Sequence, residues 1–107
     1  MRITITARHC EIPDELRLRA RTLVERLSKI APRPHDGQVI FLEDHGAPTV
    51  EVRLHRARGA VHVGTAVAAD HRTALDLAVR KVRRQLDKAP ARRRVARPRR
   101  VLEREPR

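Results

Sequence analysis

The first thirty residues change from a strand-like to a helix-like pattern of apolar positions. Residues 3–7 read Ile-Thr-Ile-Thr-Ala, an alternation of apolar and polar side chains that is typical of a half-buried β-strand. From Ile12 to Ala31 the apolar side chains instead recur three or four residues apart, and the segment Pro13-Asp14-Glu15 carries residue types that are common at helix starts. We predict a strand followed by a helix over about residues 13–30.

Three short runs in the middle of the chain predict three more strands. Val39–Leu42 is an apolar run too short for a helix, and it follows an expected turn at Asp36-Gly37, so we predict a strand buried on much of both faces. Residues 50–55 alternate clearly between apolar and charged side chains, and residues 60–67 alternate between mainly β-branched and small or polar ones. The tight Arg58-Gly59 connection between these two runs predicts a hairpin.

A second amphipathic helix ends the patterned part of the chain. Asp70 is a good N-cap, and an apolar stripe from Leu75 to Leu86 recurs with helical spacing, which predicts a helix over about residues 71–88. The expected order is therefore β-α-β-β-β-α, an α+β fold with a four-stranded, largely antiparallel sheet and both helices on one face. We expect residues 1–88 to form this single domain.

Composition restricts both the core and the partners. The chain has 107 residues, enough for one domain, and 40% of them are hydrophobic, but Phe41 is the only aromatic residue. The core is therefore expected to be aliphatic, and a platform of exposed aromatic rings that stacks single-stranded bases is excluded. The net charge of +12 favours a polyanionic partner. Half of that charge lies in residues 89–107, which hold eight Arg and three Pro and which we predict to be a disordered basic tail.

Few residues could support catalysis, a metal site or membrane insertion. Cys10 is the only cysteine, which excludes an internal disulfide and a cysteine-rich zinc site. A nucleophilic cysteine needs a base beside it, but the neighbouring His9 should point to the opposite face of the strand. Cys10 is therefore interpreted as a small core residue. The six His are scattered, and the chain has no glycine-rich phosphate loop or serine elbow. We expect no enzymatic activity, cofactor, metal or small-molecule substrate, and the lack of a long apolar run favours a cytoplasmic protein without a membrane span.

The last predicted helix carries the strongest candidate binding surface. On a helical wheel, Lys81, Arg84 and Lys88 share a narrow sector opposite the apolar stripe, with Arg80 beside them. Cations one helical turn apart can contact successive phosphates of a nucleic acid, and the Arg92-Arg93-Arg94 run extends this sector into the tail. The alternative is an ordinary solvated helix face in an arginine-rich chain.

Three further features bear on the candidate surfaces. Leu77 lies in the cationic sector, where a purely solvated face would seldom have an apolar side chain. The outer sheet face is expected to lack large apolar groups and to form a second, modestly cationic surface from Thr4, Thr6, Arg8, Arg53, His55 and His62. The first helix has a set of arginines that are interpreted mainly as a solvated helix surface, namely Arg17, Arg19, Arg21 and Arg26.

Several of these segments together resemble the ribosome hibernation-promoting factors and the related ribosome-associated inhibitor A proteins. The segments that carry the resemblance are Ile3–Arg8, Glu11-Ile12, Leu16-Arg17, Arg58-Gly59, Asp70–Asp76 and Lys81–Lys88. The similarity covers about residues 2–88 and implies a fold related to double-stranded-RNA-binding domains. It also implies docking in the decoding region of the small ribosomal subunit, where such proteins block the sites of tRNA and messenger RNA.

The resemblance assigns particular residues to rRNA binding. The basic positions of the family on the last helix fall on Lys81, Arg84 and Lys88, and Arg8 on the first strand is a further expected contact. Two departures from the family are visible. Long members append a dimerisation domain, for which these 107 residues have no room, and short inhibitor-type members end in an acidic tail, whereas this tail is basic. Whether the protein promotes or opposes pairing of ribosomes stays open.

The sequence thus predicts a non-enzymatic translation regulator that binds the rRNA of the small ribosomal subunit and stabilises idle ribosomes under stress. The residues expected to contact rRNA are Lys81, Arg84, Lys88, Arg80, Arg8, Arg92, Arg93 and Arg94. The cationic tail is expected to add contacts to rRNA or to the messenger channel. Two other classes fit the same features: a general double-stranded nucleic-acid-binding module, and a protein-interaction module that modulates transcription.

Overall fold

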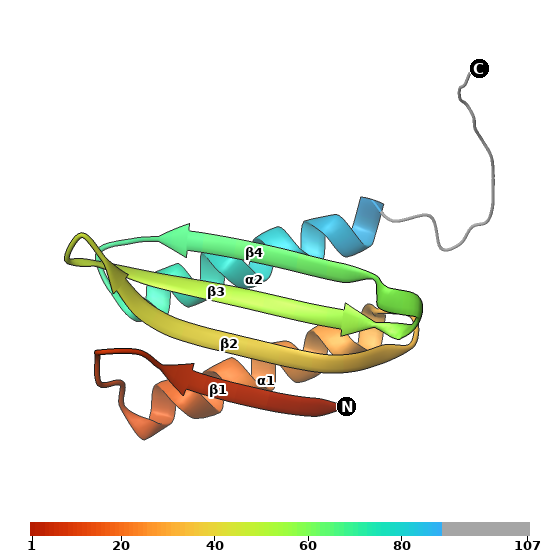
Figure 1. Ribbon diagram of the computed structural model, residues 1–107, viewed down its shortest axis with the longest axis horizontal. Helices are drawn as coiled ribbons and strands as arrows, with labels where there is room; N and C mark the ends of the chain where they lie inside the picture. Colours follow the sequence, from red (N-terminus) through yellow and green to blue (C-terminus); the bar gives the residue numbers. More distant parts are fainter. Residues whose placement is uncertain (89–107) are drawn as a thin grey trace, which may run out of the picture.

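The computed structural model describes residues 1–88 and confirms the β-α-β-β-β-α order (Figure 1). The predicted disordered tail of residues 89–107, with Arg92, Arg93 and Arg94, lies outside the described residues. The elements are β1 (Arg2–Ala7), α1 (Asp14–Ile30), β2 (Pro34–Asp44), β3 (Ala47–Arg56), a short 3-10 turn (Ala57–Gly59), β4 (Val61–Val67) and α2 (His71–Lys88).

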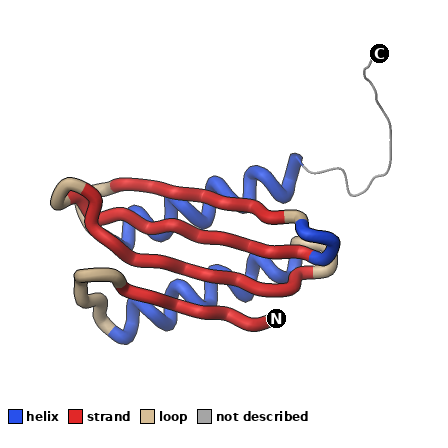
Figure 2. The backbone as a smooth tube through the Cα atoms, viewed as in Figure 1, coloured by secondary structure: helices blue, strands red, loops and turns tan. Residues whose placement is uncertain are grey.

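The four strands form one sheet in the order β1-β2-β3-β4. β1 and β2 are parallel, because the crossover helix α1 returns the chain to the same end of the sheet, whereas the β2–β3 and β3–β4 pairs are antiparallel. Both helices lie behind the same face of this sheet, and within residues 1–88 no other element covers the opposite face (Figure 2). The predicted two-layer arrangement is therefore confirmed.

The core lies between the inner face of the sheet and the two helices. Phe41 is fully buried there, and its ring meets the imidazole of His71 edge-on, with 5.8 Å between the ring centroids. Nε2 of His71 lies 2.9 Å from the carbonyl oxygen of Leu42, so the start of α2 is fixed on β2. The other buried hydrophobic residues, all aliphatic as predicted, are Leu16, Ala20, Val24, Leu27, Ala31, Val39, Val50, Val52, Leu54, Ala66, Ala74, Leu75, Ala78, Val79, Val82 and Leu86.

Strand β2 starts earlier than predicted. The expectation of a turn at Asp36-Gly37 is wrong, because both residues lie inside β2, where Gly37 pairs with Ile3 of β1 and with Leu54 of β3. A Cβ atom at residue 37 would come within 2.6 Å of Cγ1 of Val24. The glycine therefore permits tight packing of α1 on the sheet, and it does not mark a turn.

The apolar run of β2 is divided between the two faces of the sheet. Val39 and Phe41 face the helices and are fully buried, whereas Ile40 and Leu42 face outward and are half-buried. The prediction that this run is buried on much of both faces is therefore confirmed in full on the inner face and only in part on the outer face.

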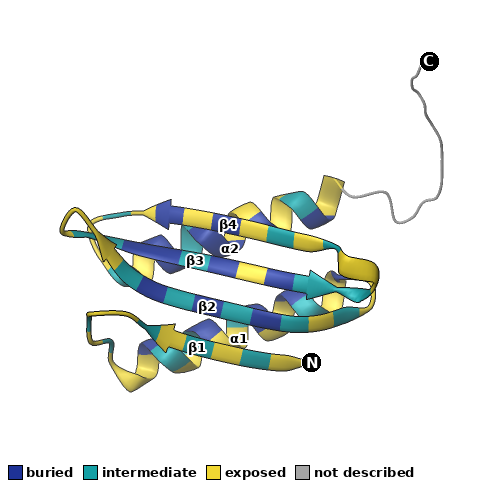
Figure 3. Ribbon diagram, viewed as in Figure 1, coloured by how far each residue is buried: buried dark blue, intermediate teal, exposed yellow. Residues whose placement is uncertain are grey.

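Buried or half-buried and exposed residues alternate along strand β4 (Figure 3). The strand presents its small residues, and not its valines, to the helices. Gly64 is buried, whereas Val61, Val63 and Val67 are 46%, 40% and 54% exposed on the outer face. The cause is the close approach of α2, since a Cβ atom at residue 64 would lie 2.4 Å from the carbonyl oxygen of Ala78. The expectation that the outer face lacks large apolar groups is therefore wrong.

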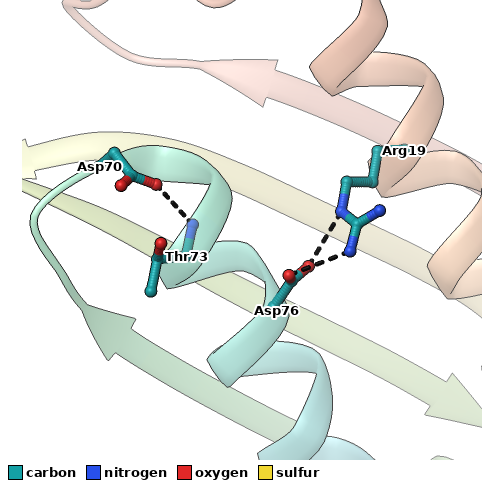
Figure 4. A network of polar contacts seen from close by, with 4 residues as sticks. All are labelled: Arg19, Asp70, Thr73 and Asp76. Carbon is teal, nitrogen blue, oxygen red and sulfur yellow. Dashed lines mark hydrogen bonds and ion pairs between the residues drawn. The ribbon is translucent and has the colours of Figure 1, made fainter.

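Local hydrogen bonds place both helix starts close to their predicted positions. The carbonyl of Pro13 accepts the backbone N–H groups of Leu16 and Arg17 at 3.0 and 3.2 Å. Asp70 acts as the predicted N-cap of α2, because its Oδ1 accepts the backbone N–H of Thr73 at 2.7 Å (Figure 4). This hydrogen bond stabilises the ionised carboxylate and lowers the pKa of Asp70.

Candidate nucleic-acid interface

Helix α2 presents its cations to solvent, as the helical wheel predicted. Arg80, Lys81, Arg84 and Lys88 are all exposed, while Val82 on the opposite side of the helix is fully buried. The apolar stripe of α2 packs on β3 and β4. Positions 80, 84 and 88 follow one another in four-residue steps, about 6 Å apart along the helix axis. The helix therefore holds positive charges at nearly even spacing.

Lys81 differs from its neighbours because its ammonium group already has a partner. Its Nζ donates a hydrogen bond to the carbonyl oxygen of Thr65 at 2.6 Å. One turn later, Nε2 of Gln85 donates to the carbonyl oxygen of Val63 at 2.7 Å. Both side chains therefore reach from α2 to β4. The other three exposed cations of the predicted sector, which we call the cationic row, are Arg80, Arg84 and Lys88.

Leu77, whose apolar side chain in the cationic sector pointed to a binding role, is explained by packing. The residue is half-buried and packs against the hydrophobic core. It lies one turn before Lys81, so it faces the same side of the helix, toward β4. The prediction that Leu77 marks a binding surface is therefore wrong.

An ion pair ties α1 to α2 (Figure 4). Nε and Nη2 of Arg19 donate to the two carboxylate oxygens of Asp76, each at 3.0 Å. The hydrogen bond to Asp76 raises the pKa of Arg19. The interpretation of Arg19 as part of a merely solvated surface is wrong, because it links the two helices. It also neutralises one of the two carboxylates that α2 carries.

Three cations that the sequence analysis did not assign to binding gather between the helices. Arg26 and Lys29 of α1 and Arg83 of α2 line a groove of about 320 Å³. The other residues lining it are Leu23, Leu27, Ile30 and Val79. A helical wheel places Arg83 beside the apolar stripe of α2, but only the packing of α1 brings the other two cations to it. These three residues extend the charged surface from the cationic row toward α1.

Arg8 does not belong to the same surface. It is exposed just beyond the end of β1, and its backbone N–H donates to the carbonyl oxygen of Phe41 at 2.8 Å. Helix α2 packs on β3 and β4, whereas β1 forms the opposite edge of the sheet. Arg8 and the cationic row therefore reach one partner only if that partner extends across the sheet.

The outer face of the sheet is less cationic than expected. Nε of Arg53 donates to a carboxylate oxygen of Glu51, so these two charges compensate each other. The two threonines of β1 are exposed as predicted, but His55 is half-buried and His62 lies on the helix side of β4. Since β4 also exposes three valines there, the charges and apolar groups of this face do not support the expectation of a second, modestly cationic surface.

His62 is held in an environment that favours its neutral form. Nε of Arg56 donates a hydrogen bond to Nε2 of His62 at 3.0 Å, which requires an unprotonated acceptor nitrogen. Partial burial, and then the charge of Arg56, lower the pKa of His62, while a hydrogen bond with Gln85 acts in the opposite direction. In the folded protein, the pKa of His62 therefore lies below the ordinary histidine value of 6.5.

This shift predicts a loss of stability at mildly acidic pH. The unfolded chain takes up its proton on His62 first as the pH falls, so the stabilisation is complete above about pH 6.5 and declines below it, through the folded pKa. Urea midpoints at about pH 7 and about pH 5 should therefore differ less in His62→Gln than in the unmodified protein. His45→Gln is the control, because the side chain of His45 is 95% exposed. Equal effects of the two substitutions would contradict the prediction.

Cys10 occupies the kind of position expected of it. It is half-buried against the core, with Sγ 3.5 Å from the carbonyl oxygen of Phe41. Among residues 1–88, no three His, Cys, Asp or Glu side chains are placed to hold a metal ion. No helix in the described part of the chain is long and apolar enough to cross a membrane.

A mixed four-stranded sheet with two helices on one face and a cationic last helix defines the chain as a small α+β protein. It belongs to the family described as Sigma 54 modulation protein / S30EA ribosomal protein, whose model matches residues 3–94. This match confirms the resemblance to the ribosome hibernation-promoting factors that the sequence segments indicated. It also reaches beyond α2, as far as Arg94.

Several solved structures share the fold, including two that match over most of this chain. A ribosomal subunit interface protein from Coxiella burnetii is 23% identical, with a TM-score of 0.73 over 86% of this chain and 100% of that one. The N-terminal domain of Protein Y from Thermus thermophilus is 21% identical, with a TM-score of 0.69 over 82% of this chain and 98% of that one. No curated protein sequence matches the chain significantly. These likenesses establish the fold, and the candidate interface rests on the geometry of this chain.

Proposed function

We propose that the protein is a ribosome hibernation factor that inhibits translation under stress or in stationary phase by binding the rRNA of the small ribosomal subunit. It acts by occlusion and not by catalysis, because it fills the space in the decoding region that tRNA and messenger RNA would use. The observation that carries this proposal is the cationic row, which is exposed on a helix anchored to the sheet and to α1. Membership of a family described as S30EA ribosomal protein supports a ribosomal partner.

The chemistry of the cationic row favours contacts to the RNA backbone over readout of bases. The only aromatic residue of the chain, Phe41, is fully buried, so it cannot stack on a base. Arg and Lys side chains one helical turn apart can each pair with a phosphate and release its counterion. The affinity for the small subunit is therefore expected to fall steeply with salt concentration.

Other cations extend the proposed surface. The groove residues Arg26, Lys29 and Arg83 continue it toward α1. The Arg92–Arg94 run, which falls within the segment matched by the family model, adds three charges shortly after α2. Arg8 would contact a separate part of the rRNA, because it lies at the other edge of the sheet.

Co-sedimentation of the purified protein with small subunits, large subunits and whole ribosomes across a salt series tests the proposal, with free duplex RNA as competitor. Saturable, near-stoichiometric binding to small subunits that resists the duplex supports it. Binding to every RNA without saturation would instead identify a general nucleic-acid-binding module. A protein partner whose binding persists at high salt without nucleic acid would instead identify a protein-interaction module. The family description also contains the words Sigma 54 modulation protein.

Lys81 and Arg84 are expected to contribute unequally to this binding. Arg84 faces solvent, whereas Lys81 must give up its hydrogen bond to Thr65 before its ammonium group can contact a phosphate. Arg84→Met should therefore weaken binding to small subunits roughly 2- to 10-fold more than Lys81→Met. The apparent Kd of each variant, divided by that of the unmodified protein, measures the difference. Equal losses would show that the bond to Thr65 does not restrain Lys81.

A further inference from the structure

Strand β4 is an edge strand of the sheet that residues 1–88 form, and its hydrogen-bonding groups alternate in direction. The backbone N–H of Arg56 donates to the carbonyl of Ala60 at 2.8 Å, and that of Ala68 donates to Pro48 at 3.1 Å, in the same register. In an antiparallel pair such bonded positions recur at every second residue. The odd-numbered residues 61–67 of β4 therefore direct their N–H and C=O groups away from β3, toward the open edge.

Two of these outward carbonyls are covered by side chains of α2. Lys81 donates to the carbonyl of Thr65 at 2.6 Å and Gln85 donates to that of Val63 at 2.7 Å. Gly64, which lies between these two residues, makes the contact possible, because the absence of a Cβ lets α2 approach β4 closely. Covering an edge with polar or charged side chains is a known way to prevent a further strand from adding to a sheet.

The outward side of β4 is complementary to itself. An antiparallel second copy centred on Gly64 would pair Val61 with Val67 and Val63 with Thr65, and all of these residues direct their backbone groups toward the edge. The three valines are 46%, 40% and 54% exposed, and such pairing would join them with those of the second copy into one apolar strip on the outer face. No charged side chain of β4 opposes this register.

We propose that β4 is a self-association edge for a second copy of this chain, and that Lys81 and Gln85 keep it closed. Pairing requires both side chains to release their carbonyls. A two-fold arrangement within one continuous sheet also places both α2 helices on the same face, so the two Lys81 side chains approach each other and their like charges oppose association. The protein is monomeric as long as this cover is in place.

Removing the cover tests the proposal without any nucleic acid. The double variant Lys81→Met, Gln85→Met keeps long, helix-compatible side chains but has no donor for the β4 carbonyls. Sedimentation equilibrium over a concentration series should show the unmodified protein as a monomer and the double variant as a dimer. The dissociation constant of the dimer should be at least roughly 10-fold lower for the double variant than for the unmodified protein. Arg80→Met with Arg84→Met is the control, because it removes two charges from α2, one more than the double variant does, and leaves the cover intact. This control should stay monomeric.

A second change separates edge pairing from other association. Val63→Pro, added to the double variant, removes an N–H that points to the open edge and costs no bond to β3, so it should restore the monomer. Hydrogen exchange provides an independent readout, since the amides of Thr65 and Val67 should become protected as the double variant dimerises. A double variant that stays monomeric, or a dimer that forms without protecting these amides, would overturn the proposal. Neither outcome bears on ribosome binding, which co-sedimentation measures separately.

Discussion

Replacing Arg84 and Lys88 together by glutamate is expected to weaken binding of the protein to small ribosomal subunits by roughly 100-fold near physiological salt. Each substitution removes one phosphate contact and places a negative charge next to a polyanion. The slope of log affinity against log salt concentration should also become shallower by about 2, because about one counterion fewer is released for each lost contact. Both side chains are exposed, so the fold should survive the change.

The matched control is the pair Arg17→Glu and Arg21→Glu on α1. These residues line a shallow depression with Ile5 of β1, on the side of α1 away from α2, and the charge change is the same. The control should retain most of the affinity and nearly the full salt dependence. If both double variants lose binding equally, net charge is responsible and the assignment of the interface to α2 is wrong. Melting curves of both variants establish that they are folded.

The largest expected effect on stability is at Gly64. A Cβ atom there would lie 2.4 Å from the carbonyl oxygen of Ala78 and 3.0 Å from Cγ2 of Val82. The nearest atom belongs to the backbone of α2, so the clash is relieved only if the whole helix moves. Gly64→Ala is therefore expected to lower the free energy of unfolding by about 2–3 kcal/mol. Because Lys81 and Gln85 reach β4 only while α2 lies this close, the substitution should also disturb the cover of the edge.

Gly37→Ala is the comparison that isolates the cause. Residue 37 also lies in a strand beneath a helix, but the nearest atom to its added Cβ would be Cγ1 of Val24, at 2.6 Å. A side-chain methyl group can be displaced by a small shift of Val24 without moving the backbone of a whole helix, so a smaller loss of about 1–2 kcal/mol is expected. Chemical denaturation of both variants measures the difference. A loss at Gly37 equal to or larger than that at Gly64 would contradict the argument from backbone contact.

Most of the candidate interface was accessible from the sequence because helix periodicity is a local property. Helical spacing and the Asp70 cap predicted α2 over residues 71–88, and the wheel predicted that Arg80, Arg84 and Lys88 would be exposed. The same wheel could not show that Lys81 has a partner, since the Thr65 carbonyl that it contacts belongs to another element. It could also not show that Leu77 packs on the core.

The sequence by itself determined the order of the elements, the limits of both helices to within about one residue, the aliphatic core and the cations of α2. Each of these follows from a period, a cap or a composition that neighbouring residues create together. Only the tertiary structure decided which face of β4 is buried. Gly64 and Ala66 lie on the buried face because α2 packs so closely there that only small residues fit, and not because of their own hydrophobicity. The tertiary structure likewise decided the pairing of Arg19 with Asp76, which are 57 residues apart, since contacts between distant segments leave no periodic signal in the chain.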